Sequence, residues 1–101
     1  MREFNPPKEA LFPLGQLYAT PGALEILGED EAVRFDAIDQ LLQRHARGDW
    51  GEVCEEDAEA NRAAVREESR ILSVYKIEKQ TVWIITEADR SATTILLPDE
   101  Y

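Results

Sequence analysis

The chain has 101 residues, with 21 acidic side chains against 11 basic ones and a formal net charge of −10. Its length suits a single hydrophobic core, and its 44% apolar content is typical of a folded chain. The excess of acids argues against direct binding to DNA or RNA and against attraction to an anionic membrane. A basic protein partner suits this charge better.

One cysteine and one histidine cannot supply a structural zinc site of the usual kind, and a lone cysteine excludes an internal disulfide. No cofactor-binding or metal-ligand motif occurs, so we expect neither a cofactor nor a metal. The first residues lack the apolar core of a signal peptide, and no apolar run reaches membrane-spanning length. These features predict a cytoplasmic protein that does not enter membranes.

Residues 1–19 contain three prolines, which disfavour helix at and before their own positions. We expect a mostly irregular N-terminal arm lying across the core, with a short strand possible near 16–19. Thr20 followed by Pro21 predicts a helix start, because threonine caps first-turn amides and proline lacks a donor that this position does not need. Gly28 can close this short helix.

A second helix is predicted from about Asp30, where apolar residues recur at spacings of three and four. Gly48 ends it, and basic residues in its last turn complement the helix dipole. A third helix is predicted over 55–68, with three acids in its first turn. Its apolar face is thin, so it can pack closely only through small side chains.

Three segments rich in β-forming residues follow at 71–77, 81–86 and 93–97. Their short connections predict an antiparallel meander with the middle segment central. The helices should cover one face of this sheet. The predicted fold is therefore a single α+β domain over residues 1–101, with two to three helices packed on a three- to four-stranded antiparallel sheet.

Two segments carry candidate binding residues. In the turn between the last two strands, Arg90 beside Ser91 could bind a phosphate or carboxylate, although Asp89 and its neighbours are also ordinary turn formers. The segment 49–59 holds six acids and no base, which is typical of a solvated helix face but would also suit docking of a basic partner. The candidate binding residues are Asp49, Trp50, Glu55, Glu56, Asp57, Asp89, Arg90 and Ser91.

His45 is the only imidazole, so any histidine-based acid–base chemistry must use it. It falls near the end of the second helix, where the dipole stabilises a charged imidazole and a structural role is common. Both interpretations stay open on the sequence.

The segments TPGAL (20–24), GDWG (48–51) and ITEADRSATTILLPDEY (85–101) look like those of a family of small bacterial proteins often carried on plasmids and integrative elements. The resemblance covers most of the chain, from about residue 14 onward. It implies an accessory protein of a mobile genetic element and brings no reaction and no site residues.

The leading hypothesis is a non-enzymatic accessory protein that acts through protein contacts on its acidic surface and counters a host defence system. The alternative is a small metal-free ribonuclease, because the layout is similar to that of RelE-like and barnase-like toxins, although the net charge opposes RNA binding. An antitoxin is a third possibility. The catalytic candidates of the ribonuclease hypothesis are His45, Arg70, Arg90 and Thr94.

Overall fold

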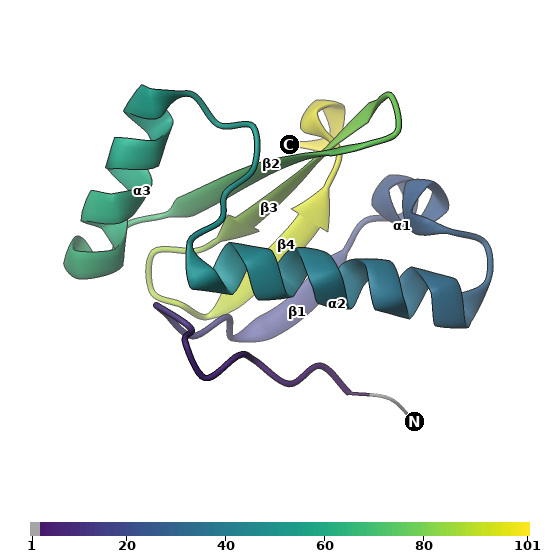
Figure 1. Ribbon diagram of the computed structural model, residues 1–101, viewed down its shortest axis with the longest axis horizontal. Helices are drawn as coiled ribbons and strands as arrows, with labels where there is room; N and C mark the ends of the chain where they lie inside the picture. The colour runs from purple at the N-terminus through teal and green to yellow at the C-terminus, as the bar shows by residue number, and fades with distance from the viewer. Residues whose placement is uncertain (1–2) are drawn as a thin grey trace.

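The structure, a computed structural model, describes residues 3–101. Within them the chain forms three α-helices, four strands and a final 3₁₀ turn. In chain order these are β1 (Gln16–Ala19), α1 (Pro21–Leu27), α2 (Glu31–Arg47), α3 (Glu55–Glu67), β2 (Ile71–Ile77), β3 (Gln80–Thr86), β4 (Ala92–Leu96) and η1 (Pro98–Glu100) (Figure 1). The predicted α+β class is confirmed.

The strands form one sheet in the order β1-β4-β3-β2. β2, β3 and β4 make the predicted antiparallel meander, with Ile84 of β3 opposite Ser73 of β2 and Ile95 of β4. β1 pairs with β4 in parallel, so the sheet is mixed where only antiparallel pairing was expected. Short turns force neighbouring strands to be antiparallel, whereas the long connection from β1 to β4 leaves their relative direction open.

Local hydrogen bonds explain where α2 begins and ends. The Asp30 carboxylate accepts bonds from the amides of Ala32 and Val33, at 2.9 and 3.2 Å. At the other end Gly48 takes a left-handed conformation with φ of 93°, and its amide donates to carbonyls of the last turn. Both ends agree with the prediction, because capping depends on residues within a single turn.

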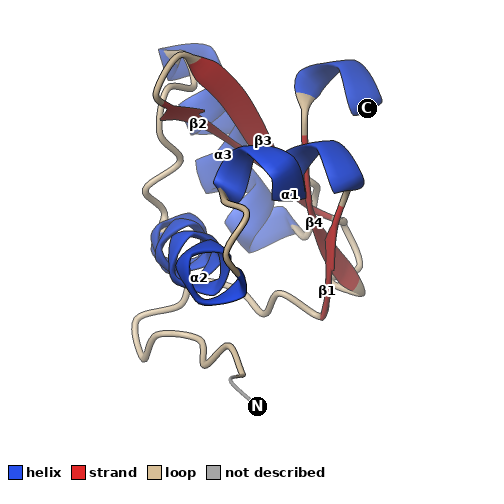
Figure 2. Ribbon diagram, turned by 90° about the vertical axis from the view of Figure 1, so that its right-hand side faces the viewer, coloured by secondary structure: helices blue, strands red, loops and turns tan. Residues whose placement is uncertain are grey.

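The hydrophobic core lies between one face of the sheet and the helices α1 and α2 (Figure 2). The other face carries η1, and its Trp83 meets the ring of Tyr101 edge-on at 5.9 Å between centroids. The buried apolar side chains of the core include Phe12, Leu14, Ala23, Leu27, Leu41, Leu42, Ala46, Trp50, Ile71, Tyr75, Val82, Ile84 and Ile95.

The outer edge of β2 is covered by two other parts of the chain. The buried Asn61 side chain of α3 donates to the carbonyl of Leu72 at 2.8 Å and accepts from the amide of the same residue at 3.1 Å. Two residues further along β2, the Val74 amide donates to the carbonyl of Trp50 at 3.0 Å, and the Glu52 amide donates to the carbonyl of Val74 at 2.6 Å. These contacts satisfy backbone groups that an edge strand would otherwise leave open.

Gly51 sits where this loop passes β2, and we expect its replacement by alanine to destabilise the fold. Its φ is 72°, and a Cβ would lie 2.0 Å from the carbonyl oxygen of Val74. The Gly51→Ala variant should lose about 2–4 kcal/mol of unfolding free energy, measured by urea titration. Gly22→Ala is the matched control, because its closest contacts are side chains that can move. Equal losses in the two variants would contradict this explanation.

The N-terminal arm, residues 3–15, has no regular element and is held against α2. The Leu11 amide donates to the carbonyl of Ala46 at 2.8 Å. The Gln43 side chain donates to the carbonyl of Asn5, also at 2.8 Å. The arm was predicted to span 1–19; β1 occupies its last four residues, and residues 1 and 2 lie outside the described part of the chain.

Candidate functional site

The single histidine lies at the centre of a buried chain of hydrogen bonds. The Nδ1 atom of His45 is 2.5 Å from the hydroxyl of Ser73 on β2, and its Nε2 atom is 2.8 Å from the hydroxyl of Thr86 on β3. Thr86 is 2.7 Å from Thr93 on β4, which donates to the carbonyl of Leu14 in the arm at 2.7 Å. The chain therefore ties α2, the meander and the arm together.

The last acceptor in this series of hydrogen bonds determines which atoms along the series carry the protons. The carbonyl of Leu14 can only accept, so the single hydroxyl proton of Thr93 is used there. Thr93 must then accept from Thr86, and Thr86 from Nε2–H of His45. This places a proton on Nε2, and in a neutral imidazole the remaining Nδ1 then accepts from the hydroxyl of Ser73.

Burial determines the charge of His45. Its side chain is 0% exposed, and burial lowers its pKa from 6.5 to about 3. The helix end was expected to stabilise a charged imidazole, but desolvation outweighs the helix dipole here. A neutral imidazole sealed from solvent has no route for proton exchange with a substrate. The arrangement favours the structural interpretation of His45.

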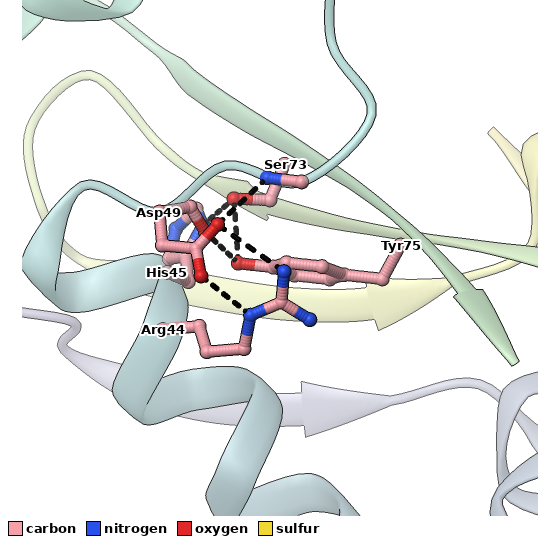
Figure 3. Close-up of polar contacts among 6 residues, drawn as sticks. Arg44, His45, Asp49, Ser73 and Tyr75 are labelled. Atoms are coloured by element: carbon pink, nitrogen blue, oxygen red, sulfur yellow. Dashed lines mark hydrogen bonds and ion pairs between the residues drawn. The ribbon is translucent and has the colours of Figure 1, made fainter.

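Next to the histidine, a polar cluster reaches from the core to the surface (Figure 3). The hydroxyl of Tyr75 donates to the backbone carbonyl of Asp49 at 2.6 Å, and burial raises its pKa. The guanidinium of Arg44 lies 4.6 Å from the Tyr75 ring and binds the Asp49 carboxylate through two nitrogens, at 2.7 and 3.2 Å. These bonds lower the pKa of Asp49. Asp49 thus holds the loop that follows α2.

The acids of segment 49–59 gather around the start of α3. Within residues 3–101, two of the six are bound by arginines, Asp49 by Arg44 and Glu55 by Arg62 at 2.9 Å. The other four side chains are exposed, and three of them lie on α3 within its first two turns. These four exposed acids are Glu52, Glu56, Asp57 and Glu59, and together with Glu55 they are called the acidic surface below. Trp50, predicted to bind a partner, is buried in the core instead, with 7% of its surface exposed.

Arg90 connects the β3–β4 turn to the end of α3. Its guanidinium donates to the carbonyl of Ala64 at 2.8 Å and to that of Ser69 at 2.7 Å. Asp89 accepts from the amide of Ser91 at 3.0 Å, which is the turn-forming bond expected of aspartate. These bonds make Arg90 a clamp between α3 and the turn, whereas Asp89 and Ser91 are exposed.

The four residues of the ribonuclease hypothesis do not come together. His45 is buried on the helix-covered side of the sheet and Arg90 binds α3, whereas Thr94 follows the core-facing Thr93 and so points to the opposite face. Arg70 also lies on that face, where its guanidinium contacts the ring and hydroxyl of Tyr101. Arg70 and Tyr101 line a hollow of about 320 Å³ with Leu72, Trp83 and Ile85.

Sequence reasoning missed the polar partners of the histidine. Ser73, Thr86 and Thr93 are fully buried, yet each was treated as an ordinary strand residue. The sequence did indicate their burial, because side chains alternate between the two faces of a strand. Each of these hydroxyl residues stands two positions from an apolar residue of its own strand that faces the core. Buried polar groups require partners, so these positions could have been matched with the single histidine.

Comparison of the chain with protein-family profiles, with curated protein sequences and with solved structures gives no match in any of the three. Across residues 3–101, no helix is both long and apolar enough to cross a membrane. Over the same residues, no three side chains of His, Cys, Asp or Glu are grouped so that they could hold a metal ion.

Proposed function

We propose that the protein is a non-enzymatic accessory protein that binds a basic protein partner through the acidic surface at the start of α3. The observation that carries this proposal is the concentration of charge there. Exposed carboxylates cover the first two turns of α3, and Arg62 pairs with one of them, Glu55. Such a surface steers a basic partner into contact and penalises an acidic one.

The state of the reactive side chains supports a binding role over a catalytic one. His45 is buried and neutral, and Arg90 is engaged with the carbonyls of Ala64 on α3 and of Ser69 just after it. Histidine and arginine are the side chains on which a metal-free ribonuclease would depend for proton transfer and phosphate binding. The resemblance of the sequence to mobile-element proteins supports an accessory role, and we propose that the partner belongs to a host defence system.

The proposal is tested by reversing the charge of the acidic surface. The triple variant Glu55→Lys, Glu56→Lys and Asp57→Lys should capture the partner from a lysate of the bacterial host at least tenfold less well than the unaltered chain. Tenfold corresponds to about 1.4 kcal/mol of binding free energy. Capture by the unaltered chain should also fall as salt is raised, because exposed charges are screened.

A second triple variant controls for total charge. Glu25, Glu29 and Glu78 are exposed elsewhere on the molecule, and their replacement by lysine changes the net charge equally. Each replacement adds two positive charges, so both variants carry −4 instead of −10. Equal capture by the two variants, or cleavage of RNA by the purified protein, would contradict the proposed function.

A further inference from the structure

The two edge strands of the sheet differ in how far other parts of the chain cover their backbone groups. The β2 edge is covered by Asn61 and by the loop after α2, whereas β1 forms the other edge and, among the described strands, pairs with β4 alone. The amides of Gln16 and Thr20 donate to carbonyls of the β4 side, at 3.0 Å each. Backbone groups alternate in direction along a strand, so the N–H and C=O groups of Leu17 and Ala19 point away from the sheet. No described segment pairs with them.

The strand is also unusually exposed for one that carries large apolar residues. Leu17 is 39% exposed and Tyr18 is 56% exposed, and the two side chains point to opposite faces. Edge strands are commonly protected by lysine, proline or an inward-pointing charge. β1, with the sequence QLYA, has none of these within its four residues.

Two hollows that are lined mainly by apolar side chains adjoin this edge and share Leu17. The larger, of about 590 Å³, lies between β1 and the N-terminal arm, which passes below the strand in Figure 1. The smaller, of about 180 Å³, lies between β1 and α2 and includes Ile38 and Leu42. Leu17 pairs with the core-facing Thr93, so its side chain and both hollows lie on the helix-covered side of the sheet. Alternate side chains of an added strand would point to that side, so these hollows suit every second residue of one extended segment.

We propose that the free edge of β1 binds an extended segment of a partner protein, with apolar residues at alternate positions and lysine or arginine at its flanks. Among residues 3–101, no charged side chain lines either hollow, which favours an apolar centre. The chain around them carries −10, which favours basic flanks and opposes a second acidic copy. The inference rests on the proposed function only in requiring a protein partner, and it uses a different surface.

The test uses a phage-displayed library of random twelve-residue peptides, selected on the immobilised full chain. Selected peptides should show alternating apolar residues with basic flanks. When a selected peptide is synthesised, its binding should protect the amides of Leu17 and Ala19 from hydrogen exchange. N-methylation of every second peptide amide, in one of the two possible registers, should abolish binding, because only one set of amides faces β1.

Leu17→Pro should weaken binding of the selected peptide at least tenfold. Its amide makes no bond within the sheet, so the substitution removes an outward donor and leaves the pairing with β4 in place. Leu17→Lys is a second variant that keeps the amide and places a charge at the edge. Val33→Ser, which changes another exposed apolar residue, is the matched control and should bind as the unaltered chain does.

Three results would overturn the inference. The selection could enrich no peptide over the bare support, or the selected peptides could bind the Leu17 variants as well as the unaltered chain. The third result is a dimer of the protein that the Leu17→Lys substitution dissociates. The last would mean that a second copy occupies the edge. The lysine variant of the acidic surface separates this inference from the proposed function. If no peptide is selected but the lysine variant captures the partner less well than the unaltered chain, only the β1 edge site is rejected. If a peptide binds the β1 edge but the lysine variant captures the partner normally, only the acidic surface is rejected.

Discussion

Lowering the pH from 7 to 5 should reduce the free energy of unfolding by about 2 kcal/mol, chiefly through His45. Burial lowers the pKa of this imidazole to about 3, against 6.5 in the unfolded chain. Between these values the unfolded state binds a proton that the native state does not, so stability falls as the pH falls. The slope is about 1.4 kcal/mol per pH unit. Above pH 6.5 the stabilisation is complete, and it is lost progressively toward pH 3.

Urea titrations at pH 7, 6 and 5 measure this dependence. The window above pH 5 isolates the histidine, because the carboxylates with lowered pKa values, those of Asp49, Asp89 and Glu100, lose their contribution at lower pH. Burial is the cause of the lowered pKa of His45. The ring nitrogens bond to the hydroxyls of Ser73 and Thr86, and the ring of Phe12 meets the imidazole edge-on at 5.3 Å between centroids. Constant stability from pH 7 to 5 would contradict a buried neutral His45.

The variant His45→Gln provides the control. It should be less stable than the unaltered chain at pH 7 by about 2–4 kcal/mol, because an amide cannot reach both buried hydroxyls with the geometry of the ring. It should also lose most of the pH dependence between 7 and 5, since the titrating group is gone. Retention of the full slope in this variant would assign the pH dependence to another group.

Asn61→Ala should destabilise the fold by about 2–4 kcal/mol, the second large effect that we expect. The substitution removes the donor and the acceptor that serve Leu72 and leaves two backbone groups on the covered edge of β2 without partners. Asn61→Asp should cost a similar amount at pH 7, because a carboxylate can accept from the amide but opposes the carbonyl. Chemical denaturation with a constant m-value is the appropriate measurement.

Arg66→Ala is the control for this edge. It also lies on α3, but its side chain is exposed and its guanidinium bonds to the carbonyl of Arg62, so the change should stay within about 0.5 kcal/mol. Both Asn61 variants should also show faster hydrogen exchange at the amide of Leu72. A loss below about 1 kcal/mol in Asn61→Ala would mean that water replaces the side chain and that the edge is not sealed by α3.

The candidate site was only partly predictable. The acidic surface could be read directly, because charge density along 49–59 does not depend on how the chain folds. The role of Arg90 could not, because its partners Ala64 and Ser69 lie more than twenty positions away in the sequence. Trp50 was a candidate binding residue, but its burial, which depends on how the loop folds onto the core, removes it from the surface where binding was expected.

The sequence by itself determined the helices, the meander and the acidity of the chain. Caps such as Asp30 and Gly48 act within one turn, and hydrophobic periodicity acts within one element, so short-range patterns suffice. Only the tertiary structure decided that β1 runs parallel to β4, that its edge stays open, and that His45 is neutral. Each of these depends on segments distant in sequence being brought together, and pairing direction, edge coverage and desolvation arise from that assembly rather than from local propensity.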